Sequence, residues 1–295
     1  IMDKIMHRIG LHGKSFIPMI MGFGCNVPAV MATRTIESRR SRLITMLVIP
    51  FMSCTGRLPL YILMTGLFFP HYASMVLLGL YVLGILVAVC SAHIIGWFIK
   101  EEDLPFVMEL PPYRIPTVKS VFRHTWEKGK QYLHKMSGII LVCSIIIWFL
   151  GYFPRHDSYS TAAEQQENSY IGHIGKVIEP LFEPLGFDWK MSTSVLSGIG
   201  AKELVVSTLG VMYSAENEEA DNNINLQEAL QKNISSAAAL AYMVFVLLYF
   251  PCIATFVAIK QESGSWKWAV SSAVYTICVA WMIAFITYRL AMSLI

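Results

Sequence analysis

Residues 72–98 form an apolar stretch without a single Lys, Arg, Asp or Glu. A helix that crosses a bilayer needs about 20 predominantly apolar residues, so this stretch is long enough to cross. Residues 136–153 and 268–288 are nearly as free of charge. Charged residues make up only 15% of the chain, whereas a soluble domain carries roughly 25%. The sequence therefore predicts a multi-pass protein of the lipid bilayer and excludes a soluble enzyme domain.

Four further apolar segments contain residues that interrupt helices. They are residues 16–33, with Pro18, Gly22, Gly24 and Pro28; residues 43–69, with Pro50, Gly56 and Pro59; residues 192–213, with Gly198 and Gly200; and residues 235–259, with Pro251. Irregular backbone at membrane depth is tolerated only where it faces protein or a water-filled cavity. We therefore predict an all-α polytopic membrane protein with two gate-type repeats that contain broken or re-entrant helices.

The interruptions follow a similar order in the two halves of the chain. Each half has a glycine-rich interruption, at 22–26 and at 198–203, followed by a proline break with a cysteine close by, at 50–54 and at 251–252. Paired interrupted segments are the best sequence indication of a transporter's binding site. Counting segments makes the halves parallel, but one re-entrant segment would make them inverted, and both arrangements remain open.

We expect four regions along the chain. These are a first gate region at 1–70; membrane helices at 71–153, with a cytoplasmic amphipathic helix at about 117–132; an external loop and second gate region at 154–262; and a C-terminal membrane helix at 263–295. Lys and Arg are frequent at 34–42 and at 100–135, and such loops face the cytoplasm. This orientation places residues 154–190 outside and the acidic residues 215–228 inside.

Cys25 lies between Gly24 and Asn26, in backbone that glycine and proline keep from forming a regular helix. A thiol, an amide oxygen and carbonyls can converge there, and this mixed set suits a borderline ion such as Fe(II). Cys54 and Cys252, each beside a proline break, are the expected partners. Carbonyls at these breaks are expected to be free, because only an unbroken helix uses its carbonyls in its own hydrogen bonds. The cysteines of uninterrupted segments are expected to be small buried hydrophobes, and they are Cys90, Cys143 and Cys278.

Lys202 and Glu203 are ionisable residues in the middle of an apolar segment, where a charge facing lipid costs roughly 2.5 kcal/mol or more. We expect both to face the protein interior or water. Glu203 is predicted to act as a cation ligand or proton acceptor, or to form an internal ion pair. Arg57 is predicted to form a salt bridge or to donate to a backbone carbonyl. The residues expected to support gating are Gly22, Gly24, Pro28, Pro50, Ser53, Gly198, Gly200, Lys202 and Pro251.

The motifs of common enzymes give no support to a catalytic function. The string GLHGKS at residues 10–15 ends like a phosphate loop, but the leading glycine would have to fall at Arg8. Zinc-protease and nucleophile-elbow motifs are absent from the sequence. The net charge of +3 is small and scattered, which excludes the basic face of a nucleic-acid-binding protein. We therefore predict a transporter rather than an enzyme.

Several strings make a family recognisable, above all GFGCNVPA at residues 22–29, PFMSC at 50–54, SGIGAKELV at 197–205 and LLYFPCIATF at 247–256. The chain resembles the membrane part of the bacterial ferrous iron transport protein B (FeoB) family. This resemblance implies an Fe2+ permease of the bacterial inner membrane, with Cys25, Cys54 and Cys252 lining the iron path. It also implies that an N-terminal G-protein domain, which would bind GTP and Mg2+ and regulate or drive transport, lies outside this chain.

The same resemblance suggests further partners, namely small cytoplasmic Feo accessory proteins and a second copy of the chain in a homo-oligomer. It also leads us to expect that the chain is a fragment of a longer protein. Two alternative functions stay open. The gate-type repeat is similar to that of nucleoside transporters, so a carrier of nucleosides or other small solutes is the first. A membrane-embedded enzyme or a sensor is the second, with Lys202 and Glu203 as its reactive candidates.

Overall fold

The structure is a computed structural model that describes Met6 and residues 10–99, 117–154, 165, 167–214 and 230–294. All regular secondary structure in these residues is helical, and no strand occurs among them. Four of the described helical stretches are long and apolar enough to cross a membrane: Arg39–Phe68, Ala73–Phe98, Ser236–Ser263 and Trp266–Ser293. These findings confirm the prediction of an all-α, multi-pass membrane protein.

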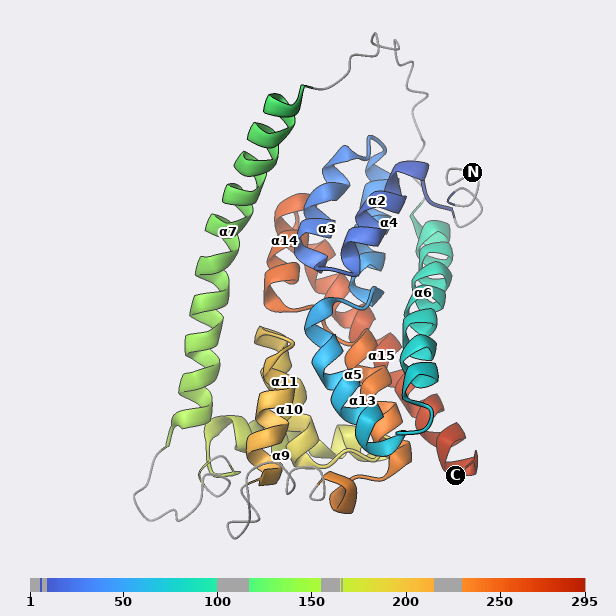
Figure 1. The fold of residues 1–295 in the computed structure, drawn as a ribbon, viewed down its shortest axis with the longest axis vertical. Helices are drawn as coiled ribbons and strands as arrows, with labels where there is room; N and C mark the ends of the chain where they lie inside the picture. Colours follow the sequence, from blue (N-terminus) through green and yellow to red (C-terminus); the bar gives the residue numbers. More distant parts are fainter. Residues whose placement is uncertain are drawn as a thin grey trace.

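The helices follow one another along the chain as coloured in Figure 1. The first half contains η1 (Gly13–Ser15), α2 (Phe16–Gly22), α3 (Asn26–Ala32), η2 (Thr33–Thr35), α4 (Arg39–Val48), η3 (Ile49–Phe51), η4 (Thr55–Arg57), α5 (Leu58–Phe68) and α6 (Ala73–Phe98). The second half contains α7 (Val118–Tyr152), α9 (Tyr170–Phe182), η5 (Glu183–Leu185), α10 (Trp189–Gly200), α11 (Leu204–Ser214), α13 (Ser236–Leu248), α14 (Ile253–Ser263) and α15 (Trp266–Leu294).

The two glycine-rich interruptions form the tips of two helical hairpins. Helices α2 and α3 pair in the upper part of Figure 1, and α10 and α11 pair in its lower part. The outer ends of the lower hairpin meet, because the Tyr213 hydroxyl donates a 2.6 Å hydrogen bond to Asp188 Oδ2. Helix α10 has 12 residues and α11 has 11. At about 1.5 Å per residue, neither helix could cross an apolar layer of about 30 Å by itself.

Two longer paths cross the bundle in opposite directions. In Figure 1, α4 lies above α5, whereas α13 lies below α14. At the lower end, Gln231 before α13 donates a 2.9 Å hydrogen bond to the carbonyl of Leu67 near the end of α5. At the upper end, Arg34 after α3 forms a two-point ion pair with Glu262 near the end of α14. The hairpin and the crossing path of one half therefore start at the opposite end of the bundle from those of the other half.

The lower hairpin overturns one expected loop placement. A single crossing by residues 192–213 would put residues 154–190 and 215–228 on opposite sides of the membrane. Instead, α10 ends at Gly200, the chain reverses, and α11 returns to the end of the bundle where α9 lies and α13 begins. The expected placement is therefore wrong for the helices that flank residues 215–228, which themselves lie outside the described residues.

Helix α7 is continuous where the sequence predicts two elements. The expected amphipathic helix at 117–132 and the apolar segment at 136–153 are joined in one helix of 35 residues. That helix contains no proline, the residue that most strongly ends a helix. It packs along α9, α10 and α14 at one side of the bundle (Figure 1). A separate amphipathic helix at 117–132 is therefore not found.

The core lies around α13, whose side chains are almost all buried. Phe245 in the middle of α13 makes ring contacts with Phe182, Phe187 and Tyr249, at centroid distances of 5.2, 5.9 and 5.4 Å. Aromatic pairs at such distances stabilise a core beyond the burial of their apolar area. Because α13 also packs on α5 and α15, it holds the interrupted helices of both halves against one another.

Candidate functional site

The four interruptions meet near the middle of the bundle (Figure 1). Thr55 joins the two interruptions of the first half, at 22–26 and 50–57. Its backbone N–H and its hydroxyl both donate to the Gly24 carbonyl, at 3.2 and 2.9 Å. Lys202 joins the two interruptions of the second half, at 198–203 and 249–252, because its Nζ donates to the Phe250 carbonyl at 2.7 Å. The two pairs touch at Gly56, where an added Cβ would lie 2.7 Å from Glu203 Oε1. We call this region the break junction, defined by residues 22–26, 50–57, 198–203 and 249–252.

Three cysteines lie in the break junction, and each directly precedes a helix. Cys25 precedes α3, Cys54 precedes η4 and Cys252 precedes α14, all with non-helical backbone angles. A proline adjoins one of these positions, since Pro251, which has no N–H to donate to a helix, directly precedes Cys252. All three thiols are half-buried. Each is thus partly enclosed by protein and still accessible.

The three thiols approach one another only in part. Cys25 Sγ lies 3.9 Å from the Tyr132 hydroxyl of α7, and Cys252 Sγ lies 3.1 Å from Thr255 Oγ1. Cys25 and Cys252 border the same apolar cluster, and Cys25 is within electrostatic range of Cys54. Nevertheless, no three His, Cys, Asp or Glu side chains in the described part of the chain are placed to hold one metal ion. An ion bound here would need amide or carbonyl oxygens, or a rearrangement that brings the thiols together.

Asn26 is the amide residue predicted beside Cys25, and it begins α3. Its side chain is buried, and its Oδ1 has no hydrogen-bond partner among the described residues. Gly22 leaves space beside this oxygen, since an added Cβ would lie 3.7 Å from Asn26 Oδ1 and 3.0 Å from Met52 Cβ. A buried acceptor without a donor is costly, so its presence favours a function. Asn26 therefore offers an oxygen to a cation.

Several backbone carbonyls at the breaks already have donors, contrary to the prediction that they are free. The Gly24 carbonyl accepts from Thr55. The carbonyls of Met52 and Pro50 accept from Arg57, at 2.9 and 3.2 Å. Carbonyls released by a break must find other donors when they are buried. The protein supplies those donors itself, so an incoming ion would have to displace them.

The ionisable residues of the break junction differ in how far they are buried. Lys202 and Arg57 are buried, at 5% and 1% exposure. Arg57 donates to backbone carbonyls, which is one of its two predicted roles. Glu203 is exposed, so the protein interior does not enclose it, and of its two expected surroundings only water remains. Since Lys202 and Glu203 are adjacent at the turn between α10 and α11, their side chains point in different directions, and only one enters the core.

The residues predicted to support gating lie where close packing is needed. An added Cβ on Gly198 would lie 2.3 Å from both Tyr249 Oη and Val205 Cγ2, and one on Gly200 would lie 2.1 Å from Ile147 Cδ1 of α7. Pro50 lies in η3 and Pro28 in the first turn of α3. Ser53 is buried directly before Cys54, and Pro251 separates Phe250 from Cys252.

The cysteines of uninterrupted helices lie apart from the break junction. Cys90 in α6 and Cys278 in α15 are exposed, and Cys143 in α7 is half-buried. The expectation that these three are buried is therefore wrong for Cys90 and Cys278, because α6 and α15 turn those faces outward, and Cys143 is enclosed only in part. Sequence reasoning also missed Thr55, Tyr132 and Tyr249. Only the position of Thr55 directly after Cys54 could have indicated its role.

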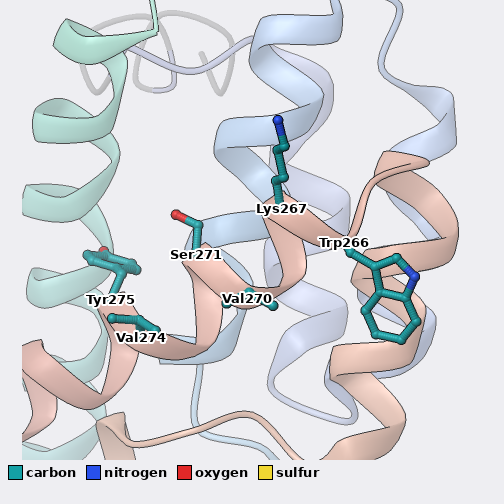
Figure 2. Close-up of a pocket in the computed structure, with 6 residues that line it drawn as sticks. All are labelled: Trp266, Lys267, Val270, Ser271, Val274 and Tyr275. Carbon is teal, nitrogen blue, oxygen red and sulfur yellow. The ribbon is translucent and has the colours of Figure 1, made fainter.

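A pocket on α15 lies away from the predicted ligands. Figure 2 shows the six residues that line it, Trp266, Lys267, Val270, Ser271, Val274 and Tyr275, all on this one helix. None of them belongs to the break junction, and most of the pocket surface is apolar. The pocket is therefore a feature of the outer face of α15 rather than a candidate ion site.

Comparison with known proteins identifies relatives along the whole chain. The family profile named Gate, described as nucleoside recognition, matches residues 1–68 and 133–266. A second profile, described as ferrous iron transport protein B C terminus, matches residues 77–128. The two profiles overlap nowhere, and together they include every residue of the break junction.

Curated relatives extend this similarity to nearly every residue. The Fe(2+) transport protein A/Fe(2+) transporter FeoB fusion protein of Porphyromonas gingivalis is 53% identical over 98% of this chain. The Fe(2+) transporters FeoB of Campylobacter jejuni and Methanocaldococcus jannaschii are 42% and 40% identical, over 100% and 97% of the chain. The chain spans 39%, 49% and 42% of the lengths of these three relatives. No solved structure matches the chain.

Proposed function

This chain belongs to the Gate family and matches the C-terminal membrane part of FeoB proteins, and from this premise we propose that it forms the permease of a ferrous iron uptake transporter. The single observation that carries the proposal is the break junction. There, interrupted helices from both ends of the bundle meet (Figure 1), and their interruptions carry three half-buried thiols and a buried amide oxygen. Thiol and oxygen donors together suit a borderline divalent ion such as Fe(II).

The opposite directions of the two halves support an inverted repeat. Each half supplies one hairpin, α2–α3 or α10–α11, and one interrupted crossing path, α4–α5 or α13–α14. Transporters with this plan bind their substrate where the interrupted helices meet, and they move by rocking one repeat against the other. We propose that Cys25, Asn26, Cys54 and Cys252 are iron ligands and that exposed Glu203 attracts the ion or accepts a proton. Binding must remain weak enough for release.

The orientation proposed for the molecule follows from its basic residues. Lys14, Arg34 and the arginines at the start of α4 lie at the end of the bundle that carries the upper hairpin. Basic loops face the cytoplasm, so this end is proposed to be cytoplasmic and the membrane to be the bacterial inner membrane. The proposed partners at that end are an N-terminal G-protein domain with its GTP and Mg2+, small Feo accessory proteins and further copies of the chain.

A carrier of nucleosides is the second candidate function, because the Gate profile is described as nucleoside recognition. The two functions predict different chemistry at the break junction. A nucleoside would use polar groups and an aromatic surface and would not need thiols, whereas Fe(II) would use the cysteines directly. The presence of a thiol beside three of the four interruptions favours iron.

Uptake by the full-length protein that contains this chain tests the proposal. The protein would be reconstituted into liposomes and supplied with radioactive Fe(II), with Mn(II), Zn(II) or a nucleoside mixture as competitor. We expect saturable iron uptake that nucleosides leave unchanged. Nucleoside uptake, or an absence of iron uptake by protein that is folded and correctly inserted, would overturn it.

A further inference from the structure

Both interrupted crossing paths have their released carbonyls bound by a buried cationic side chain. In α4–α5 this cation is Arg57, which donates to the carbonyls of Met52 and Pro50. In α13–α14 it is Lys202, whose Nζ donates to the Phe250 carbonyl at 2.7 Å and lies 3.3 Å from the ring centroid of Tyr249. A carbonyl oxygen and an aromatic face are both groups that attract cations. The Phe250 carbonyl and the Tyr249 ring thus form a cation site that the chain fills with its own ammonium.

The two cations differ in how they are held. Arg57 binds carbonyls only five and seven residues away, so it closes its own break. Lys202 comes from the turn between α10 and α11 and reaches a carbonyl 48 residues away. It therefore links the lower hairpin to the break between α13 and α14. A guanidinium that binds two carbonyls is held in a rigid fork, whereas an ammonium on a flexible four-carbon stem can swing away. Of the two, Lys202 is the cation that can leave its site.

The ammonium of Lys202 lies where an ion bound to Cys252 would need oxygen ligands. Phe250 and Cys252 are separated by Pro251 alone. Lys202 is also within electrostatic range of Arg57, Cys252, Cys54 and Glu203. A divalent ion that used the Phe250 carbonyl together with Cys252 would meet a positive charge already in place. Because like charges in a buried site repel strongly, the two cations cannot occupy it together.

We propose that Lys202 is a tethered competitor of the transported cation, and that iron gains the Phe250 carbonyl and Cys252 only when the ammonium leaves. This inference rests on the proposed function. Departure of Lys202 also breaks the link between the turn of the lower hairpin and the break in α13–α14. Exchange of one cation for the other would therefore couple ion binding to a movement of the hairpin. Glu203, next in the chain and exposed, is placed to receive the displaced ammonium.

Replacing Lys202 by Met tests this exchange, because Met keeps the length of the side chain and removes its charge. The matched control is Lys190→Met, which removes another buried lysine from the same hairpin, one whose Nζ lies 4.9 Å from the Tyr213 ring centroid. In the full-length protein, the iron concentration that protects Cys252 from a maleimide would be read by peptide mass spectrometry. We expect it to fall about tenfold in Lys202→Met, the factor that corresponds to about 1.4 kcal/mol, and to stay unchanged in Lys190→Met.

Iron uptake into liposomes without GTP provides the second measurement. We expect Lys202→Met to raise this basal uptake, since the barrier that the ammonium imposes is gone. If Lys202→Met fails to fold, Lys202→Gln carries the same expectation, because Gln keeps a polar hydrogen-bond donor but has no charge. Unchanged or weaker protection of Cys252 in the folded variant would overturn the inference. If the wild-type protein takes up no iron and iron does not protect Cys252, the proposed function itself fails.

Discussion

Adding one methyl group to Gly84 tests how closely α6 approaches the break between α4 and α5. An added Cβ on Gly84 would lie 2.9 Å from the carbonyl oxygen of Phe51 and 3.5 Å from Leu247 Cδ1. The Phe51 carbonyl is main chain of η3, next to the carbonyl of Met52 that Arg57 binds, so it cannot simply turn aside. Gly84→Ala therefore forces either α6 or the break to move.

Gly79 provides the matched control in the same helix. An added Cβ there has no atom within 4 Å. Both replacements gain the same intrinsic helix propensity, about 1 kcal/mol for Gly to Ala, so this contribution cancels in the comparison. Overpacking of a tight core contact costs about 1–3 kcal/mol. We therefore expect Gly84→Ala to be less stable than Gly79→Ala by about 1–3 kcal/mol.

Thermal unfolding of the two variants in the same detergent measures this difference. Both proteins would be compared with the wild type, which we expect to lie below Gly79→Ala and at or above Gly84→Ala in stability. Equal stabilities, or a more stable Gly84→Ala protein, would refute the close approach of α6 to η3. A variant of Phe51 cannot replace this test, because the contact is made by its main-chain oxygen.

The remaining predictions concern the break junction and the ion pair between Arg34 and Glu262. Substitution of Cys25, Cys54 or Cys252 by Ala should lower Fe(II) uptake strongly at matched expression. Ala at the outward-facing Cys90 or Cys278 should leave uptake near that of the wild type. If none of the six cysteines is needed for uptake, the proposal that thiols bind the transported iron is wrong. Glu203→Gln should reduce iron uptake severalfold more than Glu183→Gln, a change at another exposed carboxylate, and equal effects would end any special role for Glu203. Glu262 is unsuitable as that control, because its side chain is 6% exposed and paired with Arg34. A double-mutant cycle of Arg34→Ala and Glu262→Ala, measured by thermal unfolding, should give a coupling free energy of about 1 kcal/mol, because Arg34 is partly exposed to solvent. If the stability losses of the two single variants simply add in the double variant, the ion pair is contradicted.

The sequence by itself determined the long apolar helix at 73–98 and the positions at which proline interrupts the helices. Residues 72–98 had to form a helix such as α6, because lipid satisfies neither charges nor unpaired backbone groups. Pro50 and Pro251 interrupt α4–α5 and α13–α14 for an equally local reason, the missing N–H and the fixed ring. The thiols beside these breaks could be named for the same reason. Such effects act within a few residues and are therefore readable from the order of residues.

Only the tertiary structure decided how the interruptions are arranged and which groups are free there. The turn at 200–203 makes a hairpin, so the described helices on either side of residues 215–228 lie at the same end of the bundle as α9, contrary to the expectation. The partners of the released carbonyls come from Thr55, Arg57 and Lys202, and Lys202 is 48 residues from the carbonyl that it binds. Lys202 is buried and Glu203 is exposed because the packing of α10 and α11 turns one side chain inward and the other outward. These outcomes depend on contacts between distant segments, and residue order alone leaves such contacts undetermined because many pairings satisfy the same local preferences.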